Sequence, residues 1–123
     1  MKVKFSDILD ANGALGKLSQ ERLPVGQSVS LARLIKKLNE EMNLFNEQRE
    51  RLLKQYGEYK EDAGGYEIPK GNLPAFRKDF DELISSEVET GTDKIKITLQ
   101  NGSTIEAAVI LGCEAFCEFE EGE

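Results

Sequence analysis

Two cysteines, Cys113 and Cys117, carry the side chains of this sequence that are best suited to covalent chemistry. The chain of 123 residues contains no histidine, which excludes cysteine–histidine catalysis and the activation of a serine through an imidazole. The two thiols do not form a usual disulfide frame, and a zinc site would need two further ligands. We interpret them as core thiols of a protein in a reducing compartment.

The acidic side chains offer no other catalytic pattern. None of the 23 aspartates and glutamates is set apart in an apolar surround that would raise its pKa for acid–base work. Residues 13–17 (GALGK) approach a phosphate-binding loop, but Ala11 stands where the first glycine is needed and Leu18 where the hydroxyl is needed. We therefore predict that the chain is not an enzyme and binds neither a cofactor nor a metal.

The overall charge argues against further classes of protein. Acidic residues outnumber lysines and arginines by 23 to 16, which gives a net charge of −7. Because nucleic-acid binding relies on clustered lysine and arginine, we expect no direct contact with nucleic acid. No apolar run approaches the ~20 residues that span a bilayer, and no signal-peptide core follows Met1, so we expect no membrane association.

The chain is organised around one long amphipathic helix. Apolar residues recur at spacings of three and four at Leu31, Ile35, Leu38, Met42, Phe45, Leu52 and Tyr56, with Arg49 in the one missing position. This period predicts a helix that packs along its length against another helix. We expect it to start between Pro24 and Ser28 and to end at Gly57 in a left-handed conformation. At roughly 45–50 Å it is longer than the ~35 Å diameter of a compact chain, so a second helix or a second copy should lie beside it.

The segment before this helix predicts a short strand and a helix. Lys2–Phe5 alternates polar and apolar residues, as a strand does. Ser6 is the expected cap of a following helix, whose apolar edge is formed by Ile8, Ala11, Leu15 and Leu18. Gly13 and Gly16 weaken this helix, and they are tolerable where another backbone comes close.

The segment after the long helix predicts a loop and a returning helix. Residues 58–71 should form an exposed loop with a small hairpin around Gly64-Gly65. The helix Asn72–Val88 follows, with Pro74 in its first turn. Its apolar positions repeat the same rhythm, so we expect it to pack antiparallel on the long helix.

The carboxyl-terminal part predicts a small sheet. Lys94–Leu99 alternates clearly and is expected to be a strand. For Thr104–Leu111 two readings remain: Asn101-Gly102 favours a hairpin and a second strand, whereas the capping box Ser103–Glu106 favours a short helix to about Glu114. We favour the helix, followed by a closing strand over Ala115–Glu120.

These elements predict a single α+β domain that covers residues 1–123. A long helical hairpin and an amino-terminal helix occupy about residues 6–88, and they pack with a small carboxyl-terminal β-sheet over about 94–120. The core of such a chain should be thin and elongated, since 32% of its residues are charged and 39% are hydrophobic.

Five residues are candidates for contact with a partner protein. Arg49 lies in the apolar seam, where it either reaches along the helix to water or sets register and partner choice. The other four are acidic and lie near the carboxyl end: Glu114, Glu118, Glu120 and Glu121. These acids form either a solubilising tail or an acidic surface that fits a basic groove, in the manner of a nucleic-acid mimic.

The order of several segments resembles a known family. The relevant stretches are Met1–Lys4, Ala14–Leu18, Arg33–Glu41, Tyr56–Glu58, Ile68-Pro69 and Lys94–Ile97, followed by an acidic end. Together they resemble a family of small uncharacterised proteins encoded by tailed phages and prophages of Gram-positive bacteria. The Gly64-Gly65 loop and the two cysteines depart from the family pattern. The resemblance implies phage origin, a place in the host bacterial cytoplasm or the virion, and work by binding.

Two functions fit this resemblance and the lack of catalytic residues. The first is an inhibitor or adaptor that binds a host or antiphage-defence protein. The second is a component of the virion or of tail assembly that acts through helix packing, with a homodimer as one form of that packing. Both require a protein partner, from the host or from the phage. We favour the inhibitor or adaptor because nothing resembles a repetitive or membrane-anchored virion part.

Overall fold

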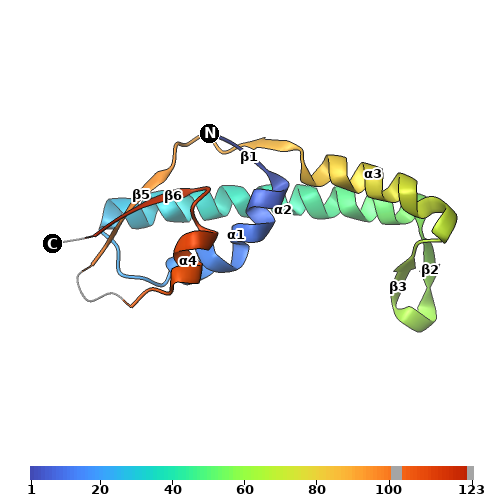
Figure 1. Ribbon diagram of the computed structural model, residues 1–123, viewed down its shortest axis with the longest axis horizontal. Coiled ribbons are helices and arrows are strands. Elements are labelled where there is room, and N and C mark those ends of the chain that lie inside the picture. The colour runs from blue at the N-terminus through green and yellow to red at the C-terminus, as the bar shows by residue number, and fades with distance from the viewer. Residues whose placement is uncertain (101–103, 122–123) are drawn as a thin grey trace.

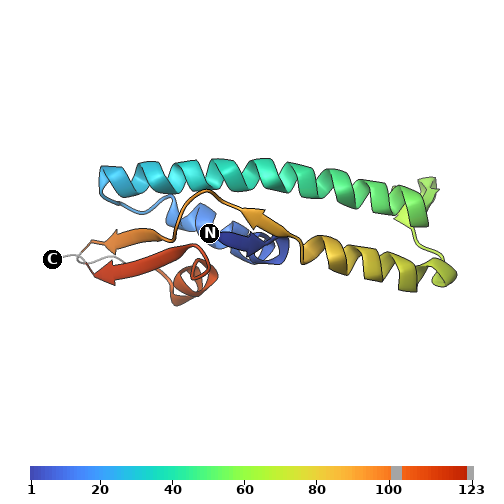
Figure 2. The same ribbon diagram turned by 90° about the horizontal axis from the view of Figure 1, so that it is seen from above.

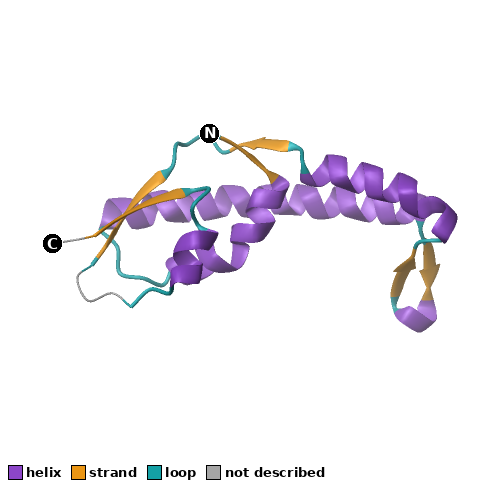
Figure 3. Ribbon diagram, viewed as in Figure 1, coloured by secondary structure: helices purple, strands orange, loops and turns teal. Residues whose placement is uncertain are grey.

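The computed structural model describes residues 1–100 and 104–121, and its elements are arranged along one long helix, α2 (Figures 1 and 2). In chain order the helices and strands are β1 (Lys2–Lys4), α1 (Phe5–Leu18), α2 (Val25–Tyr56), β2 (Glu58–Lys60), β3 (Gly65–Glu67), α3 (Leu73–Ile84), β4 (Glu87–Glu89), β5 (Ile95–Leu99), α4 (Ala107–Gly112) and β6 (Cys117–Glu121). Figure 3 shows that the strands are short and occur in pairs. The predicted α+β class is confirmed.

The long helix is an unbroken rod of 32 residues, about 48 Å at 1.5 Å per residue. Figure 2 shows α3 beside its carboxyl-terminal half and β5 beside its amino-terminal half, and α1 packs on the region between them. The predicted hairpin is therefore present, but α3 covers only part of the stripe. The chain's own α1 and β5 cover the rest, so α2 can be longer than its partner helix α3.

The buried stripe of α2 keeps the predicted 3.5-residue period over most of its length, since Leu31, Leu38 and Phe45 are seven residues apart. Leu31, Leu34, Leu38 and Phe45 are buried. At the next turn the half-buried residue is Gln48, whereas Arg49 is exposed, so the placement of Arg49 in the seam was wrong. The half-buried Leu52, seven residues after Phe45, continues the stripe beyond this point.

Aromatic side chains join α2 to α3. Phe45 lies between Phe5 of α1 and Phe80 of α3, with ring centroids 5.4 and 6.2 Å away. Further along, the Tyr56 hydroxyl donates a hydrogen bond to the Asp79 carboxylate. These contacts hold the hairpin together over its full length, and each aromatic pair adds about 0.5–1.5 kcal/mol beyond its buried area.

The start of α1 and the end of α3 differ from the prediction. Helix α1 starts at Phe5, and the Asp7 carboxylate accepts the backbone N–H of Lys4 at 2.9 Å; Ser6 is inside the helix and is not its cap. Helix α3 ends at Ile84 rather than at Val88. The last residues of the predicted helix form β4, which pairs antiparallel with β1 and brings Val88 opposite Val3.

The junction after α2 requires a glycine for a reason other than the predicted one. Gly57 is extended, with φ −103° and ψ 166°, so the expected left-handed conformation was wrong. A Cβ at this position would stand 2.6 Å from the carbonyl oxygen of Leu53. The hairpin β2–β3 follows, as predicted, and Gly64 in its turn is left-handed with φ 67°.

The carboxyl-terminal part is a strand–helix–strand unit, which confirms the favoured helix over the alternative hairpin. Strand β6 pairs parallel with β5, with Ile95 opposite Cys117. The intervening α4 excludes the alternative strand for residues 104–111, although it starts at Ala107, later than the capping box suggested; Asn101, Gly102 and Ser103 lie outside the described residues.

Helix α4 lies against α1 at a point of close approach. A Cβ at Gly112 would stand 2.6 Å from the Cβ of Ala14, so the small residue on α4 permits the contact. Gly13 and Gly16 of α1 face open space instead, with no atom within 4 Å of an added Cβ. The close backbone that would explain glycine at these two positions is therefore absent at both.

Candidate functional site

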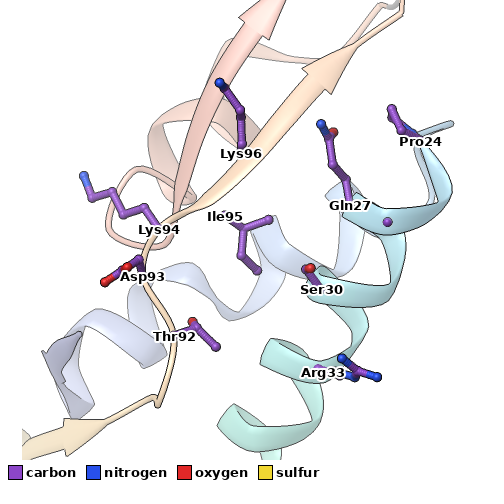
Figure 4. A pocket seen from close by; sticks show the side chains of 10 residues that line it. Pro24, Gln27, Ser30, Arg33, Thr92, Asp93, Lys94, Ile95 and Lys96 are labelled. Carbon is purple, nitrogen blue, oxygen red and sulfur yellow. The ribbon is translucent and has the colours of Figure 1, made fainter.

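A groove separates the first turns of α2 from the segment that leads into β5 (Figure 4). Its volume is about 530 Å³, within the range of ligand sites. Gln27, Ser30 and Arg33 line the helical wall, and residues 92–96 line the other. Nearly all of these side chains are exposed, so the groove is open to solvent.

One wall of the groove is the open edge of a β-strand. The backbone N–H of Ile95 donates to the carbonyl of Phe116 at 2.9 Å, so Ile95 points its backbone groups towards β6. Along a strand of a parallel ladder, the backbone N–H and C=O groups of successive residues point to opposite edges. The N–H and C=O groups of Lys96 and Thr98 therefore point away from β6 and towards α2. At Lys96 these groups meet no hydrogen-bond partner among the described residues.

A side chain of α2 closes this edge at Thr98. The Gln27 Oε1 accepts the backbone N–H of Thr98 at 2.6 Å, and the Gln27 Nε2 donates to the Thr98 Oγ1 at 2.9 Å. The Gln27 amide thus occupies the place that a peptide group of a neighbouring strand would take. The strand edge is satisfied at Thr98 and left open at Lys96.

The rim of the groove is basic although the chain as a whole is acidic. Arg33, Lys94 and Lys96 belong to the lining, and Asp93 is the one acid among the residues that line it. Lys96 pairs with Glu120 of β6 at 3.1 Å. Neither Arg33 nor Lys94 has an ion-pair partner in the described part of the chain. Two of the three basic side chains of the rim are therefore unpaired among the described residues, and Asp93 is the one acid in the lining beside them.

The first turn of α2 adds to this positive potential. The helix has no side-chain cap at Pro24 and no acidic residue in its first turn. Its first backbone N–H groups consequently point out of the helix without an intrahelical partner, at the positive end of the helix dipole. Gly26 and Gln27, which carry two of these groups, line the groove.

The predicted contact residues fall into two separate regions. Glu118 and Glu120 lie on β6 and Glu121 at its end, while Glu114 follows α4; all four are exposed. Arg49 lies on the half of α2 that packs with α3, away from this acidic group. The structure places Glu118, Glu120 and Glu121 on one strand, with Lys96 paired to Glu120, and leaves Arg49 apart.

The groove was not predicted from the sequence, although one signal of it was visible there. The alternation of Lys94 and Lys96 with Ile95 and Ile97 indicated a strand with a basic face. Nothing in the sequence indicated that Gln27, 71 residues earlier, would bond to that strand. The site arises from a long-range contact, and local patterns do not report such contacts.

The two cysteines are buried free thiols, as the core interpretation predicted. The backbone N–H of Cys117 donates to the carbonyl of Cys113 at 2.9 Å. A hydrogen bond between the two side chains lowers the pKa of the Cys113 thiol and raises that of Cys117, and burial raises the pKa of Cys117 further. Their position between α4 and β6 places them in the core of the carboxyl-terminal unit.

Comparisons with protein-family models, with curated proteins and with solved structures find no match to this chain. Within residues 1–100 and 104–121, no helix combines the length and the apolar character needed to cross a bilayer. In the same ranges no group of three or more cysteine, aspartate or glutamate side chains could hold a metal ion. The geometry of the groove therefore carries the functional proposal.

Proposed function

We propose that this chain is a non-catalytic protein–protein interaction module that holds an extended segment of a partner protein in the groove between α2 and β5. The observation that carries the proposal is the open strand edge at Lys96 inside an exposed groove. Proteins commonly bind extended peptides by adding them to such an edge, because main-chain hydrogen bonds supply affinity for any sequence. The rigid α2 rod holds the edge in place.

The setting of this activity follows from the sequence resemblance described above. In our proposal the chain is phage-encoded, and it acts in the host bacterial cytoplasm as an inhibitor or adaptor of a host or antiphage-defence protein. The acidic surface of β6 beside the groove offers the partner a second contact. The alternative role, in the virion or in tail assembly, uses the same groove for a phage partner.

A capture experiment tests the proposal. The full chain, carrying an affinity tag, is expressed in infected cells, and the captured proteins are treated with a lysine-reactive cross-linker. We expect one stoichiometric host protein, cross-linked through Lys94 or Lys96. An Arg51→Glu variant, changed on the exposed surface of α2 far from the groove, should capture the same protein.

Other results would contradict the proposal in different ways. Capture of nothing would remove the inhibitor or adaptor function. Recovery of the chain from purified phage particles by mass spectrometry would favour the assembly role instead. A partner cross-linked only through lysines remote from the groove, such as Lys54 or Lys70, would show that the groove is not the contact surface.

A further inference from the structure

We propose that the groove takes an extended segment in which acidic side chains alternate with apolar ones, paired as an added strand along the open edge of β5 at Lys94–Lys96. This inference rests on the proposed function and names the chemistry of its partner. The occupant is a protein segment of this pattern rather than a helix, a nucleic acid or a small molecule.

The alternation of β5 defines the alternation of the occupant. Ile95 and Ile97 face the core and are 7% and 0% exposed, whereas Lys96 faces solvent. Residues on a paired strand point to the same two faces as their neighbours, about 4.5–5.5 Å away. An added strand therefore places every second side chain beside the lysines and the others beside the isoleucines. Acidic residues fit the first positions and apolar residues the second.

Strand β6 shows which side chains β5 accepts on the edge that is already paired. Opposite Ile95 and Ile97 it places Cys117 and Phe119, and opposite Lys96 it places Glu118. Glu120, two residues further on the same face, forms the 3.1 Å ion pair with Lys96. A segment with the pattern of β6 would repeat these contacts on the open edge.

The basic side chains of the rim, of which only Lys96 has an ion-pair partner among the described residues, favour acid over base in the occupant. Figure 4 shows Ile95 and Thr92 extending towards α2, while Lys94 and Lys96 extend to the opposite side of the strand. The acidic positions of an added strand would meet the two lysines there, while Arg33, in the lining on α2, adds positive potential to the other side of the groove. Ion pairs at the edge of an interface contribute modestly to affinity and strongly to selectivity and association rate.

Gln27 limits the length of the added strand. Because its amide already bonds to Thr98, new pairing extends from Lys94 to Lys96 and stops there. Few main-chain hydrogen bonds form, so the side chains beside Lys94 and Lys96 must supply much of the selectivity. This makes the preference for acid measurable with a short peptide.

A peptide titration of the full chain, followed by the backbone amide signals in NMR spectra, tests the inference. The probes are a short peptide in which glutamate alternates with valine and its counterpart with lysine in place of glutamate. We expect the glutamate peptide to bind about tenfold more tightly, to shift the amides of residues 94–96 most, and to weaken as salt is added. Equal affinity for both peptides, shifts centred elsewhere, or no binding by either would overturn the inference.

One pair of variants separates strand pairing from simple charge attraction. Lys96→Pro removes the open N–H while leaving the ladder to β6 intact, because that ladder uses Ile95 and Ile97; proline is tolerated at such an edge. Lys96→Thr removes the same charge and keeps the N–H. We expect Lys96→Pro to lose peptide binding and Lys96→Thr to retain part of it. If both bind alike, the added strand is excluded.

Charge-reversal variants test the role of the rim separately, and they do not require the strand to tolerate a proline. Arg33→Glu combined with Lys94→Glu should reverse the preference towards the lysine peptide, and Arg51→Glu should not change it. An unchanged preference in the double variant would overturn the acidic occupant. The same variants can be used in the capture experiment. If every variant still captures the partner, only the inference about the groove is wrong. If not even the unmodified chain captures a partner, the proposed function is wrong.

Discussion

The side-chain amide of Gln27 makes two hydrogen bonds with Thr98, one to the backbone N–H at 2.6 Å and one to the hydroxyl at 2.9 Å. Gln27 lies in the first turns of α2, and Thr98 lies in β5 near the other end of the sequence. This pair fixes the strand beside the helix and so sets the width of the groove. It also leaves Lys96, two residues earlier on the same edge, without a comparable partner.

Replacing Gln27 should loosen the attachment of β5 to α2. We expect Gln27→Ala to lower the free energy of unfolding by about 1–2 kcal/mol, because the Thr98 N–H loses its acceptor. Urea denaturation measures the change. Gln55→Ala, at an exposed position of the same helix, should change stability by less than about 0.5 kcal/mol. Equal effects in the two variants would argue against the role assigned to Gln27.

The junction at Gly57 should not accept a side chain. Gly57→Ala would bring a Cβ to 2.6 Å from the Leu53 oxygen and 3.3 Å from the Cβ of Tyr66, and we expect it to cost about 1–3 kcal/mol. Gly13→Ala, in the open on α1, should instead stabilise the chain by about 0.5–1 kcal/mol. Thermal or urea unfolding compares the two, and changes of the same sign would contradict the described packing.

The hydrogen bond from Tyr56 to Asp79 should appear in an alkaline titration. It raises the pKa of Tyr56, chiefly because the neutral phenol donates this hydrogen bond to the Asp79 carboxylate, with burial as a further cause. The folded pKa then exceeds the unfolded value of about 10, so this contribution to stability is full below pH 10 and is lost as pH rises through the folded pKa.

Tyrosinate absorbance measures this shift directly. The difference between the titration curves of the unmodified chain and Tyr56→Phe should have its midpoint above pH 10. In an Asp79→Asn background the midpoint should move back down. Circular dichroism at each pH confirms that the chain is still folded. A midpoint at the ordinary value in the unmodified chain would rule out the hydrogen bond in solution.

The thiols should be protected in the native state. Cys113 and Cys117 are 0% and 3% exposed, so a thiol-specific reagent should modify both slowly in buffer and rapidly in guanidinium chloride. An added cysteine at the exposed neighbouring position, made as Glu114→Cys, should react rapidly in buffer. Fast reaction of the native cysteines would show that α4 and β6 do not pack as described.

Long-range pairing limited how much of the fold could be predicted. The apolar repeat of α2 extends over many turns, so its existence and length were recognisable. Val88 fitted two patterns equally, the helical spacing from Phe80 and the alternation with Glu87 and Glu89, and only pairing with Val3 of β1 decides between them. The short helix α4 was favoured because good helix formers outweighed a hairpin turn.

The candidate site was less predictable than the fold. Lys94 and Lys96 were recognisable as one face of a strand, and Glu118 and Glu120 as part of an acidic end. Their relation to Gln27 and Arg33 depends on where β5 crosses α2. Sequence periodicity gives the faces of an element and carries no information on that crossing.

Amide hydrogen exchange at Lys96 tests the central claim most directly, because the claim is that this strand edge is open in the free chain and covered by the partner. In the isolated chain the Lys96 N–H should exchange much faster than the N–H of Ile97, which faces β6, and binding of the captured partner should slow it. A Lys96 amide already as protected as that of Ile97 in the free chain, or unchanged when the partner binds, would contradict the account.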